Sequence, residues 1–347
     1  MLTLGIDIHT RSHRIDVLDA EGKAFRAFRV RGGHDQLVEA VAALRQPVRV
    51  CFEASIECGV IHDRLSALPN VREIIVAHPA HLRRSHRKND RIDAKRLAVD
   101  AFHGRVDPVH IPSPKVRQWR QLVEFRCRQV QKRTRVKNAI KSLLRSRGIV
   151  PPIGLWTKEG RRWLRRAAMP DPTARLRRGM LLQELRLLDA QLRTMRRTLD
   201  AIAVKDDRVD LLRTAPSVGR RTAEAVVAWI DDPLRFARTT LVGSYFGIVP
   251  SQDQSGERNH LGGITKAGPK VVRWLLVEAA WRAVRKEGPI RDRYLRLLRN
   301  DPQRKRRAVV AIARHLALTM QAMLRDNQPW NAQRAAGRAE EVPAATI

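Results

Sequence analysis

The first part of the chain predicts three strands in succession and then an alternation of helices and strands, and this order restricts the fold more than any other feature. The three strands are expected at Leu2–Ile8, Arg14–Leu18 and Ala24–Val30, where apolar and polar residues alternate. Turn signals separate them at Asp19-Ala20-Glu21-Gly22 and Arg31-Gly32-Gly33. The chain is therefore expected to build a sheet from its beginning.

Helices and strands alternate over the rest of this segment. Helical patterns occupy His34–Leu44, Val60–Leu68 and Asp90–Phe102, and strands are expected at Val48–Phe52 and Glu73–Ala77. Three strands followed by such an alternation predict an α/β domain with a mixed sheet. We expect this domain to span residues 1–112.

From Ser113 onward, strand patterns give way to long basic helical patterns. They span Lys115–Arg147 and Thr173–Val204 and predict a helical hairpin or coiled coil over residues 113–205. Residues 111–205 hold 25 basic and 6 acidic side chains, an excess of 19 positive charges. This surface fits a nucleic acid, although a long helix also exposes charges simply to stay soluble.

Proline and glycine mark both ends of the connection between the two helices. Pro151-Pro152-Ile153-Gly154 begins it and Met169-Pro170-Asp171-Pro172 ends it, which predicts a turn between helices. Four arginines near Trp163 are expected to contact nucleic acid: Arg161, Arg162, Arg165 and Arg166. A mostly helical unit with one glycine-rich loop is expected over residues 206–328, followed by a disordered tail over residues 329–347.

The overall charge points to a polyanionic partner. The 347 residues include 68 Lys and Arg against 35 Asp and Glu, a formal charge of +33, while 43% apolar residues are enough for packed cores. No apolar run approaches the roughly 18 residues of a membrane-spanning helix, so we expect no membrane contact and a cytoplasmic, nucleoid-associated protein. Cys51, Cys58 and Cys127 lack paired metal-ligand spacing and are expected to be reduced thiols.

Two acidic residues stand at the ends of predicted strands. Asp7 lies near the end of the first strand, between two isoleucines, and Glu53 directly follows the strand Val48–Phe52. A carboxylate between apolar neighbours is costly unless a metal ion or another partner compensates its charge. Each acid taken alone also fits a helix cap or a charge in water.

A pair of acids follows on the helix predicted over Asp90–Phe102. Asp90 and Asp93 are three residues apart and therefore share one face of it. Their mutual repulsion is relieved if divalent metal binds, because Mg²⁺ prefers oxygen ligands, and two such ions about 4 Å apart can stabilise both oxygens of a phosphoryl transfer. The alternative is a helix start at which the dipole favours both acids.

With these motifs the chain resembles the DEDD-type transposases of bacterial insertion sequences, whose relatives are guided by a bridge RNA. The matching segments are Gly5-Ile6-Asp7, Phe52-Glu53-Ala54 and the run from Asp90 to Ala98, and the resemblance covers roughly residues 1–328. It implies an RNase-H-like domain similar to the RuvC-like Holliday-junction resolvases, which would bind two Mg²⁺ ions, with Mn²⁺ as a substitute. The implied metal ligands are Asp7, Glu53, Asp90 and Asp93. Within the third motif, Arg91 and Lys95 are expected to contact nucleic acid.

Two positions depart from the family pattern. His9-Thr10 replaces a frequent Ser-Lys after the first acid, and Ser55-Ile56 stands where Thr-Gly is common. Neither departure removes a carboxylate. Glu57 remains a rival to Glu53, although it lies beyond the strand end and fits the motif less well.

A second phosphate-binding element is expected near the start of the third unit. Leu211–Ala223 resembles a helix-hairpin-helix, with Ser217 in place of the usual first glycine. The turn of such a motif offers backbone N–H groups and a helix start to a phosphate. The expected contacts are Gly219, Arg220 and Arg221, and a plain interhelical turn is the alternative.

The glycine-rich loop contains the candidate nucleophile. By itself this loop indicates only a backbone that can approach a ligand closely. The family pattern is a Ser-Gly followed by Gly-x-hydrophobic-Ser/Thr-Lys-x-Gly. It is matched by Ser255-Gly256 and by Gly263-x-Thr265-Lys266-x-Gly268, with Pro269 replacing a frequent Asn. The resemblance implies that Ser255 attacks a DNA phosphate to form a covalent phosphoserine, with Gly256 and Lys266 contacting the nucleic acid. Serine needs a base or a metal for activation.

Three functions compete on this basis. The first is a metal-dependent DNA recombinase that cuts and rejoins donor and target DNA, guided by a structured RNA and working as a homo-oligomer, a dimer or a tetramer. The second is an endonuclease like the Holliday-junction resolvases, which uses water in place of Ser255. The third is a non-catalytic nucleic-acid-binding protein, for which the basic helices suffice.

Overall fold

The computed structural model describes residues 1–79, 90–255 and 258–332. The chain divides into two compact units, Met1–Pro114 and Lys115–Ile347. Side chains of residues 90, 91, 253–255 and 258–261 lie outside the described part.

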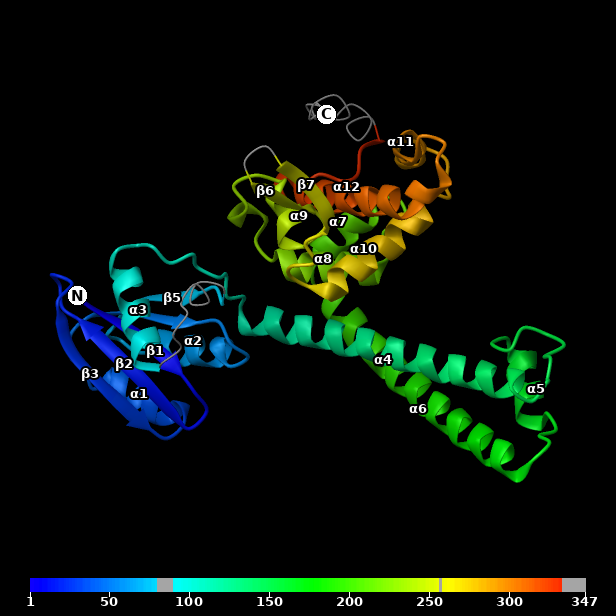
Figure 1. Ribbon diagram of the computed structural model, residues 1–347, viewed down its shortest axis with the longest axis horizontal. Helices are drawn as coiled ribbons and strands as arrows, with labels where there is room; N and C mark the ends of the chain where they lie inside the picture. Colours follow the sequence, from blue (N-terminus) through cyan, green and yellow to red (C-terminus); the bar gives the residue numbers. More distant parts are fainter. Residues whose placement is uncertain (80–89, 256–257, 333–347) are drawn as a thin grey trace. The chain divides into compact units, whose positions relative to one another are not determined.

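A five-stranded sheet forms the centre of the first unit. Its strands are β1 (Leu2–Ile8), β2 (Ser12–Leu18), β3 (Ala24–Arg31), β4 (Val48–Glu53) and β5 (Val71–Ala77), in the order β3-β2-β1-β4-β5 (Figure 1). β2 runs antiparallel to β1 and β3, β4 runs parallel to β1, and β5 runs parallel to β4. The predicted mixed sheet is confirmed, with β1 in its centre.

Three helices pack against this sheet: α1 (His34–Ala42), α2 (Cys58–Ser66) and α3 (Asp90–Phe102). Leu37 of α1 and Ile61 of α2 join Leu4 and Ile6 of β1 in one apolar cluster, in which all four side chains are almost fully buried. Leu97 of α3 belongs to another cluster, together with Cys51 of β4. Because side chains alternate between the two faces of a strand, α1 and α2 cover one face of the sheet and α3 covers the other.

Two long helices, α4 (Pro114–Arg145) and α6 (Pro172–Ala203), begin the second unit and lie side by side (Figure 1). Their buried residues at one end, including Ile140 and Leu188, form a cluster with Leu164. Leu164 belongs to α5 (Lys158–Arg166), where only a turn was expected. That expectation was wrong because prolines mark only the ends of the segment, whereas Thr157 caps a helix between them through a 3.0 Å bond from the Gly160 N–H to its hydroxyl.

The remainder of the second unit is mostly helical. It contains α7 (Asp207–Arg213), α8 (Arg220–Ile230), α9 (Leu241–Tyr245), α10 (Lys270–Ala283), α11 (Pro289–Leu298) and α12 (Lys305–Asp326), with two short 3₁₀ turns, η2 (Pro233–Arg235) and η3 (Pro302–Arg304). One large core joins these helices, and Trp119, Cys127 and Leu199 bring the adjoining ends of α4 and α6 into it. The predicted glycine-rich loop is instead a hairpin of β6 (Pro250–Ser255) and β7 (Arg258–Ile264).

The end of the described chain is attached to this core. The Trp330 N–H donates to the Thr214 hydroxyl at 2.9 Å, and the Trp330 ring packs against the core. Residues 333–347 of the tail expected over 329–347 lie outside the described residues. No helix in the described ranges is long and apolar enough to cross a membrane, and Cys51, Cys58 and Cys127 are free thiols.

Candidate active site

Asp7 and Glu53 lie at the same edge of the sheet on neighbouring parallel strands. β1 and β4 are in register from Leu2 and Val48 to Ile6 and Phe52, so each acid is the next residue after a paired position. Asp7 follows Gly5 by two residues and Glu53 follows Cys51 by two, and both therefore face α3. The spacing along the strands places these two acids on one face of the sheet.

Gly5 determines how closely α3 approaches this face. A Cβ at position 5 would overlap the carbonyl oxygen of Ala94 and the amide nitrogen of Ala98 in α3. The absence of a side chain therefore allows the helix backbone to lie directly on β1. Asp93, one residue before Ala94, is held beside the strand that carries Asp7.

The direction of α3 places its first turn at the edge of the sheet that carries Asp7. Phe102, the last residue of the helix, lies against Gly22 in the turn between β2 and β3. That turn is near the beginning of β1, because Leu18 pairs with Thr3. The first turn of α3, with Asp90 and Asp93, therefore lies toward the end of β1.

The carboxylates differ in their surroundings. Asp93 is buried, with 8% of its surface exposed. Asp7 is 19% exposed and lies 3.1 Å from Nε2 of His9, a half-exposed side chain. Among residues with described side chains, no three His, Cys, Asp or Glu groups are close enough to share one metal ion. The side chain of Asp90 lies outside the described part, so the four-ligand site stays a prediction.

The structure adds two histidines to this edge of the sheet. His9 contacts Asp7. Because His9 follows Asp7 by only two residues, this spacing is the sequence signal that could have identified His9 as a site residue. His34 lies 3.4 Å from Glu57, the residue at the start of α2. The rival acid Glu57 is thus paired with a histidine of α1. Of the nearby predicted nucleic-acid contacts, Lys95 is exposed and the side chain of Arg91 lies outside the described part.

The turn between α7 and α8 has the backbone conformation of a tight hairpin. Ser217 adopts a φ of +62°, which favours glycine, the residue expected there. Gly219 is the N-cap of α8. Both Arg220 and Arg221 form ion pairs with Asp200 of α6. The two arginines therefore join α8 to α6.

Glu224 lies in α8, four residues after the helix begins at Arg220, and is fully buried. Its oxygen Oε2 is 2.8 Å from Nη1 of Arg221, but the geometry is that of an ion pair without a hydrogen bond. Burial raises the pKa of Glu224 to about 7, although Arg221 opposes the shift. A titratable group therefore sits inside the junction of α8 with the long helices.

The base of the β6–β7 hairpin is tightly held. Lys266, with a φ of +56°, donates its N–H to the Gly247 carbonyl at 3.1 Å. Gly268 lies against the Tyr245 carbonyl, where a Cβ would overlap it. Arg273 donates to the carbonyls of Phe246 and Gly268, each at 3.1 Å. Gly268 thus allows close packing within the chain, whereas the glycine pattern alone indicates a backbone that can approach a ligand.

The candidate nucleophile lies at the far end of this hairpin. Ser255 is the last residue of β6 and pairs with Arg258 of β7. Its side chain and Gly256 lie outside the described part of the chain. The Lys266 side chain, at the base, is exposed.

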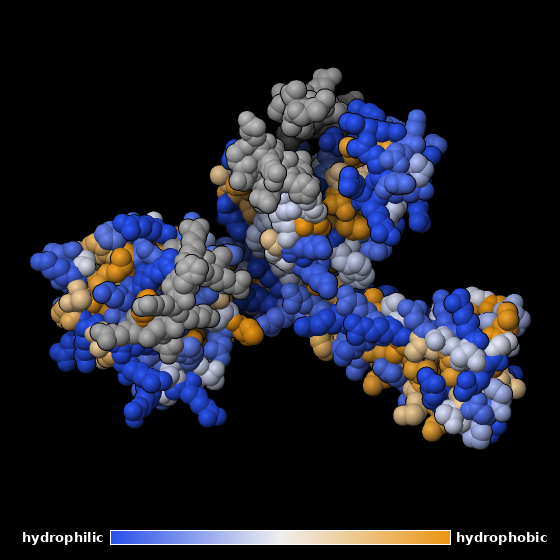
Figure 2. Space-filling view, in the orientation of Figure 1, coloured by the Kyte–Doolittle hydropathy of each residue, from blue (hydrophilic) through white to orange (hydrophobic). Residues whose placement is uncertain are grey.

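The four arginines of α5 differ in whether they form an ion pair within the chain. Arg161 forms a 2.9 Å ion pair with Asp189 of α6. Arg162, Arg165 and Arg166 are exposed on α5. Figure 2 shows hydrophilic surface along the long helices on the face in view, with apolar patches between.

Two family models match the chain. A model of DEDD transposases of the IS110 type, described as "Transposase", matches residues 4–148. A model described as "Transposase IS116/IS110/IS902 family" matches residues 209–295. The first therefore covers nearly all of the sheet and the whole of α3 and α4, and the second covers most of α7 through most of α11.

Curated relatives agree with these matches. A "Transposase for insertion sequence element IS1111A" of Coxiella burnetii is 28% identical over 80% of this chain and 76% of its own length. A "Probable family 20 transposase" of Pseudomonas aeruginosa is 28% identical over 65% of this chain and 68% of its own. A "Pilin gene-inverting protein" of Moraxella lacunata is 27% identical over 36% of this chain and 39% of its own. The chain contains transposase domains of the IS110/IS116/IS902 family of insertion sequences and is a DNA-processing enzyme of transposition.

Proposed function

We propose that this transposase cuts and rejoins DNA with an RNase-H-like carboxylate site and a serine nucleophile. The observation that carries the proposal is the contact of Gly5 with the α3 backbone, because it holds Asp93 over the strand that carries Asp7. Asp7 and Glu53 face the same helix from neighbouring strands. Asp90, in the first turn of α3, completes the proposed set.

The donors fit divalent metal ions. Carboxylates are the hard oxygen ligands that Mg²⁺ and Mn²⁺ prefer, and the 8% exposure of Asp93 makes an uncompensated charge costly there. Asp7, Glu53, Asp90 and Asp93 would hold two ions. When bound, the ions would stabilise the negative charge that develops on the phosphate oxygens. His9 contacts Asp7 and would orient that carboxylate.

Ser255 would conserve the energy of the broken phosphodiester. In the proposed step its Oγ forms a bond to phosphorus, one DNA P–O bond breaks, the hydroxyl proton is lost to a base and the departing DNA oxygen gains a proton. The strand stays attached through a phosphoserine ester and is rejoined by the reverse chemistry. Lys266, exposed at the base of the hairpin, would contact a phosphate of the flanking strand rather than the one that is attacked.

The basic helices would hold the nucleic acid, including a structured guide RNA. Exposed basic residues recur along α4 and α6, among them Arg128, Lys132, Arg135, Arg186 and Arg193. Arg162, Arg165 and Arg166 extend this charge over α5. The excess of 19 charges in residues 111–205 supports a polyanion larger than the cleaved phosphate alone.

An oligomer is the proposed working form, through an apolar seam on α6. Leu176, Met180 and Leu187 are 64%, 63% and 58% exposed. With the exposed Gln183 and Ala190 they repeat at intervals of four and three, the spacing of a coiled-coil seam. A hollow of about 500 Å³ around Gly179 lies beside Leu176 and Met180 and would accept a side chain of a second copy.

A water-using nuclease is the second candidate. It would need the carboxylate site without Ser255. The curated relative named for pilin-gene inversion supports rejoining over hydrolysis, since inversion leaves no broken strand. A non-catalytic binding protein would need neither group.

The test compares two carboxylates of α3 on a plasmid that carries the DNA flanking the gene on both sides. Asp93→Asn should abolish Mg²⁺-dependent strand cleavage while the protein still folds and binds DNA. Asp100→Asn is the matched control, because Asp100 lies on the same helix and pairs with Arg96 at 3.5 Å. Cleavage retained in Asp93→Asn, or lost equally in both variants, would contradict the proposed metal site.

A further inference from the structure

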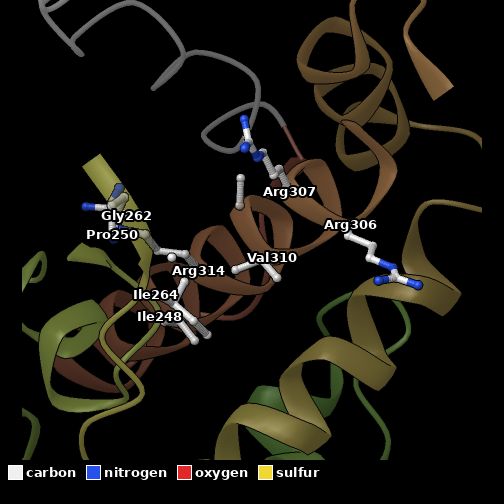
Figure 3. A pocket seen from close by; sticks show the side chains of 10 residues that line it. Ile248, Pro250, Gly262, Ile264, Arg306, Arg307, Val310 and Arg314 are labelled. Atoms are coloured by element: carbon white, nitrogen blue, oxygen red, sulfur yellow. The ribbon is translucent and has the colours of Figure 1, made fainter. Parts of the chain in front are cut away.

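A groove of about 710 Å³ lies between the base of the β6–β7 hairpin and α12 (Figure 3). Its apolar wall includes Ile248, Ile264 and Val310, and three arginines of α12 line it: Arg306, Arg307 and Arg314. The volume is within the range of about 300–1,000 Å³ that is typical of ligand sites. The groove thus joins an aliphatic surface to a concentrated positive charge.

The charge at the start of α12 has no internal explanation. The 3₁₀ turn η3 ends at Arg304, and Lys305, Arg306 and Arg307 follow in the first turn of α12, which contains no acidic residue. The N-terminus of a helix already carries partial positive charge, so this arrangement opposes helix formation. Arg306 and Arg307 are both exposed, and the first turn of the helix offers them no acidic partner. An external anion would remove the conflict.

Arg314 gives a second, independent indication. Its Nε is buried and has no hydrogen-bond partner among the described residues. The side chain packs over Gly243, where a Cβ would lie 3.2 Å from Nε, and Figure 3 shows it extending toward Pro250 and Gly262 on the hairpin. Arg314 also lines the groove, and its terminal N–H groups, unlike the buried Nε, can donate to a phosphate oxygen there.

The groove lies on the same hairpin as Ser255. Pro250 lines it, and Ser255 follows five residues later along β6. At roughly 3.3 Å per residue, the two positions are about 17 Å apart, which is a distance of a few nucleotides along a strand. The groove is therefore too far from Ser255 to hold the phosphate that Ser255 would attack.

We propose that this groove binds one unpaired nucleotide of the DNA strand that flanks the cleavage position. The arginines bind its phosphate, and its base lies against the aliphatic wall formed by Ile248, Ile264 and Val310. The base has to be unpaired, because stacking within a duplex would keep it from that wall. The identity of the strand rests on the proposed function, whereas the chemistry of the groove does not.

The test measures binding of the full-length protein without divalent metal, so that no strand is cut. The probes are an oligothymidylate of about eight nucleotides, within the usual size of single-strand sites, and an abasic strand of the same length and charge. The wild type should bind the oligothymidylate about fivefold more tightly, because one base leaves water for an aliphatic surface. Ala311→Phe, which fills the groove, should abolish the difference, and so should Val310→Gln, which only makes the wall polar.

The phosphate contact has its own control. Replacing Arg306 and Arg307 together by Ala should lower the slope of log Kd against log salt by about 0.7, the value for one phosphate of a single strand. Lys305→Ala removes the same kind of charge one residue earlier, outside the groove, and should leave the slope unchanged. If the wild type binds both probes equally, or if both wall variants keep the fivefold preference, the proposal is overturned. Failure to find a Ser255 adduct would contradict the proposed nucleophile and leave these binding results intact.

Discussion

Gly5 in the central strand lies directly against the carbonyl oxygen of Ala94 in α3, and this contact joins two acidic motifs that are far apart in the sequence. Asp7 follows Gly5 by two residues, and Asp93 precedes Ala94. One missing side chain thus sets the distance between strand and helix, and with it the spacing of the candidate metal ligands.

Gly5→Ala should therefore damage both the fold and the site. The added methyl group meets backbone atoms that cannot rotate away, and overpacking of this kind costs about 1–3 kcal/mol or more. Urea denaturation should show lower stability, and Mg²⁺-dependent cleavage should fall even where the variant remains folded. Gly33→Ala is the control, because a Cβ there meets nothing closer than 3.9 Å. Equal stability of the two variants would contradict the role given to Gly5.

Ser255→Ala should separate the recombinase from the water-using nuclease. With the wild type, denaturing a cleavage reaction and digesting the product should yield a Ser255 peptide with a DNA phosphate attached. The variant should lose this adduct and recombination, yet keep DNA binding. Ser251→Ala is the control, because Ser251 is on the same strand and donates to the Gly263 carbonyl at 3.0 Å. Wild-type cleavage with free phosphate ends and no adduct would favour the nuclease.

Glu224 should make stability depend on pH. Burial raises its pKa in the folded protein to about 7, from 4.5 in its ordinary state. The folded state therefore binds this proton more tightly, and stability falls as pH rises from 4.5 to 7. Glu224→Gln should remove this fall, which amounts to about 3 kcal/mol because each pKa unit corresponds to about 1.4 kcal/mol. Urea unfolding at several pH values measures it, and parallel curves for variant and wild type would contradict the shift.

The apolar seam of α6 should control self-association. Leu187→Glu places a charge in the middle of the seam and should shift the protein toward monomer in sedimentation experiments without nucleic acid. Arg196→Glu changes an exposed residue nine positions from Leu187, on the opposite side of the same helix, and should leave the association unchanged. A wild type that is already monomeric, or equal effects of both variants, would exclude this surface as the interface.

Much of the first unit could be predicted because its elements depend on local patterns. The strand Leu2–Ile8 and the helix Asp90–Phe102 have the predicted bounds, since alternation and helical spacing are properties of neighbouring residues. The β6–β7 hairpin was missed because its glycines and polar residues also fit a loop. α5 was missed because flanking prolines concealed a capped helix.

By itself, the sequence determined which residues are candidates for the chemistry: acids at two strand ends, a pair at one helix start and a serine beside glycine. Only the tertiary structure decided what surrounds them. The sequence predicts that Arg220 and Arg221 contact phosphate, whereas in the structure both form ion pairs with Asp200 of α6. The glycine pattern around Gly268 indicates a backbone that can approach a ligand, whereas in the structure Gly268 lies against the Tyr245 carbonyl. The physical reason is that spacing along the chain sets the direction of a side chain, whereas its partners are brought to it by packing between distant segments.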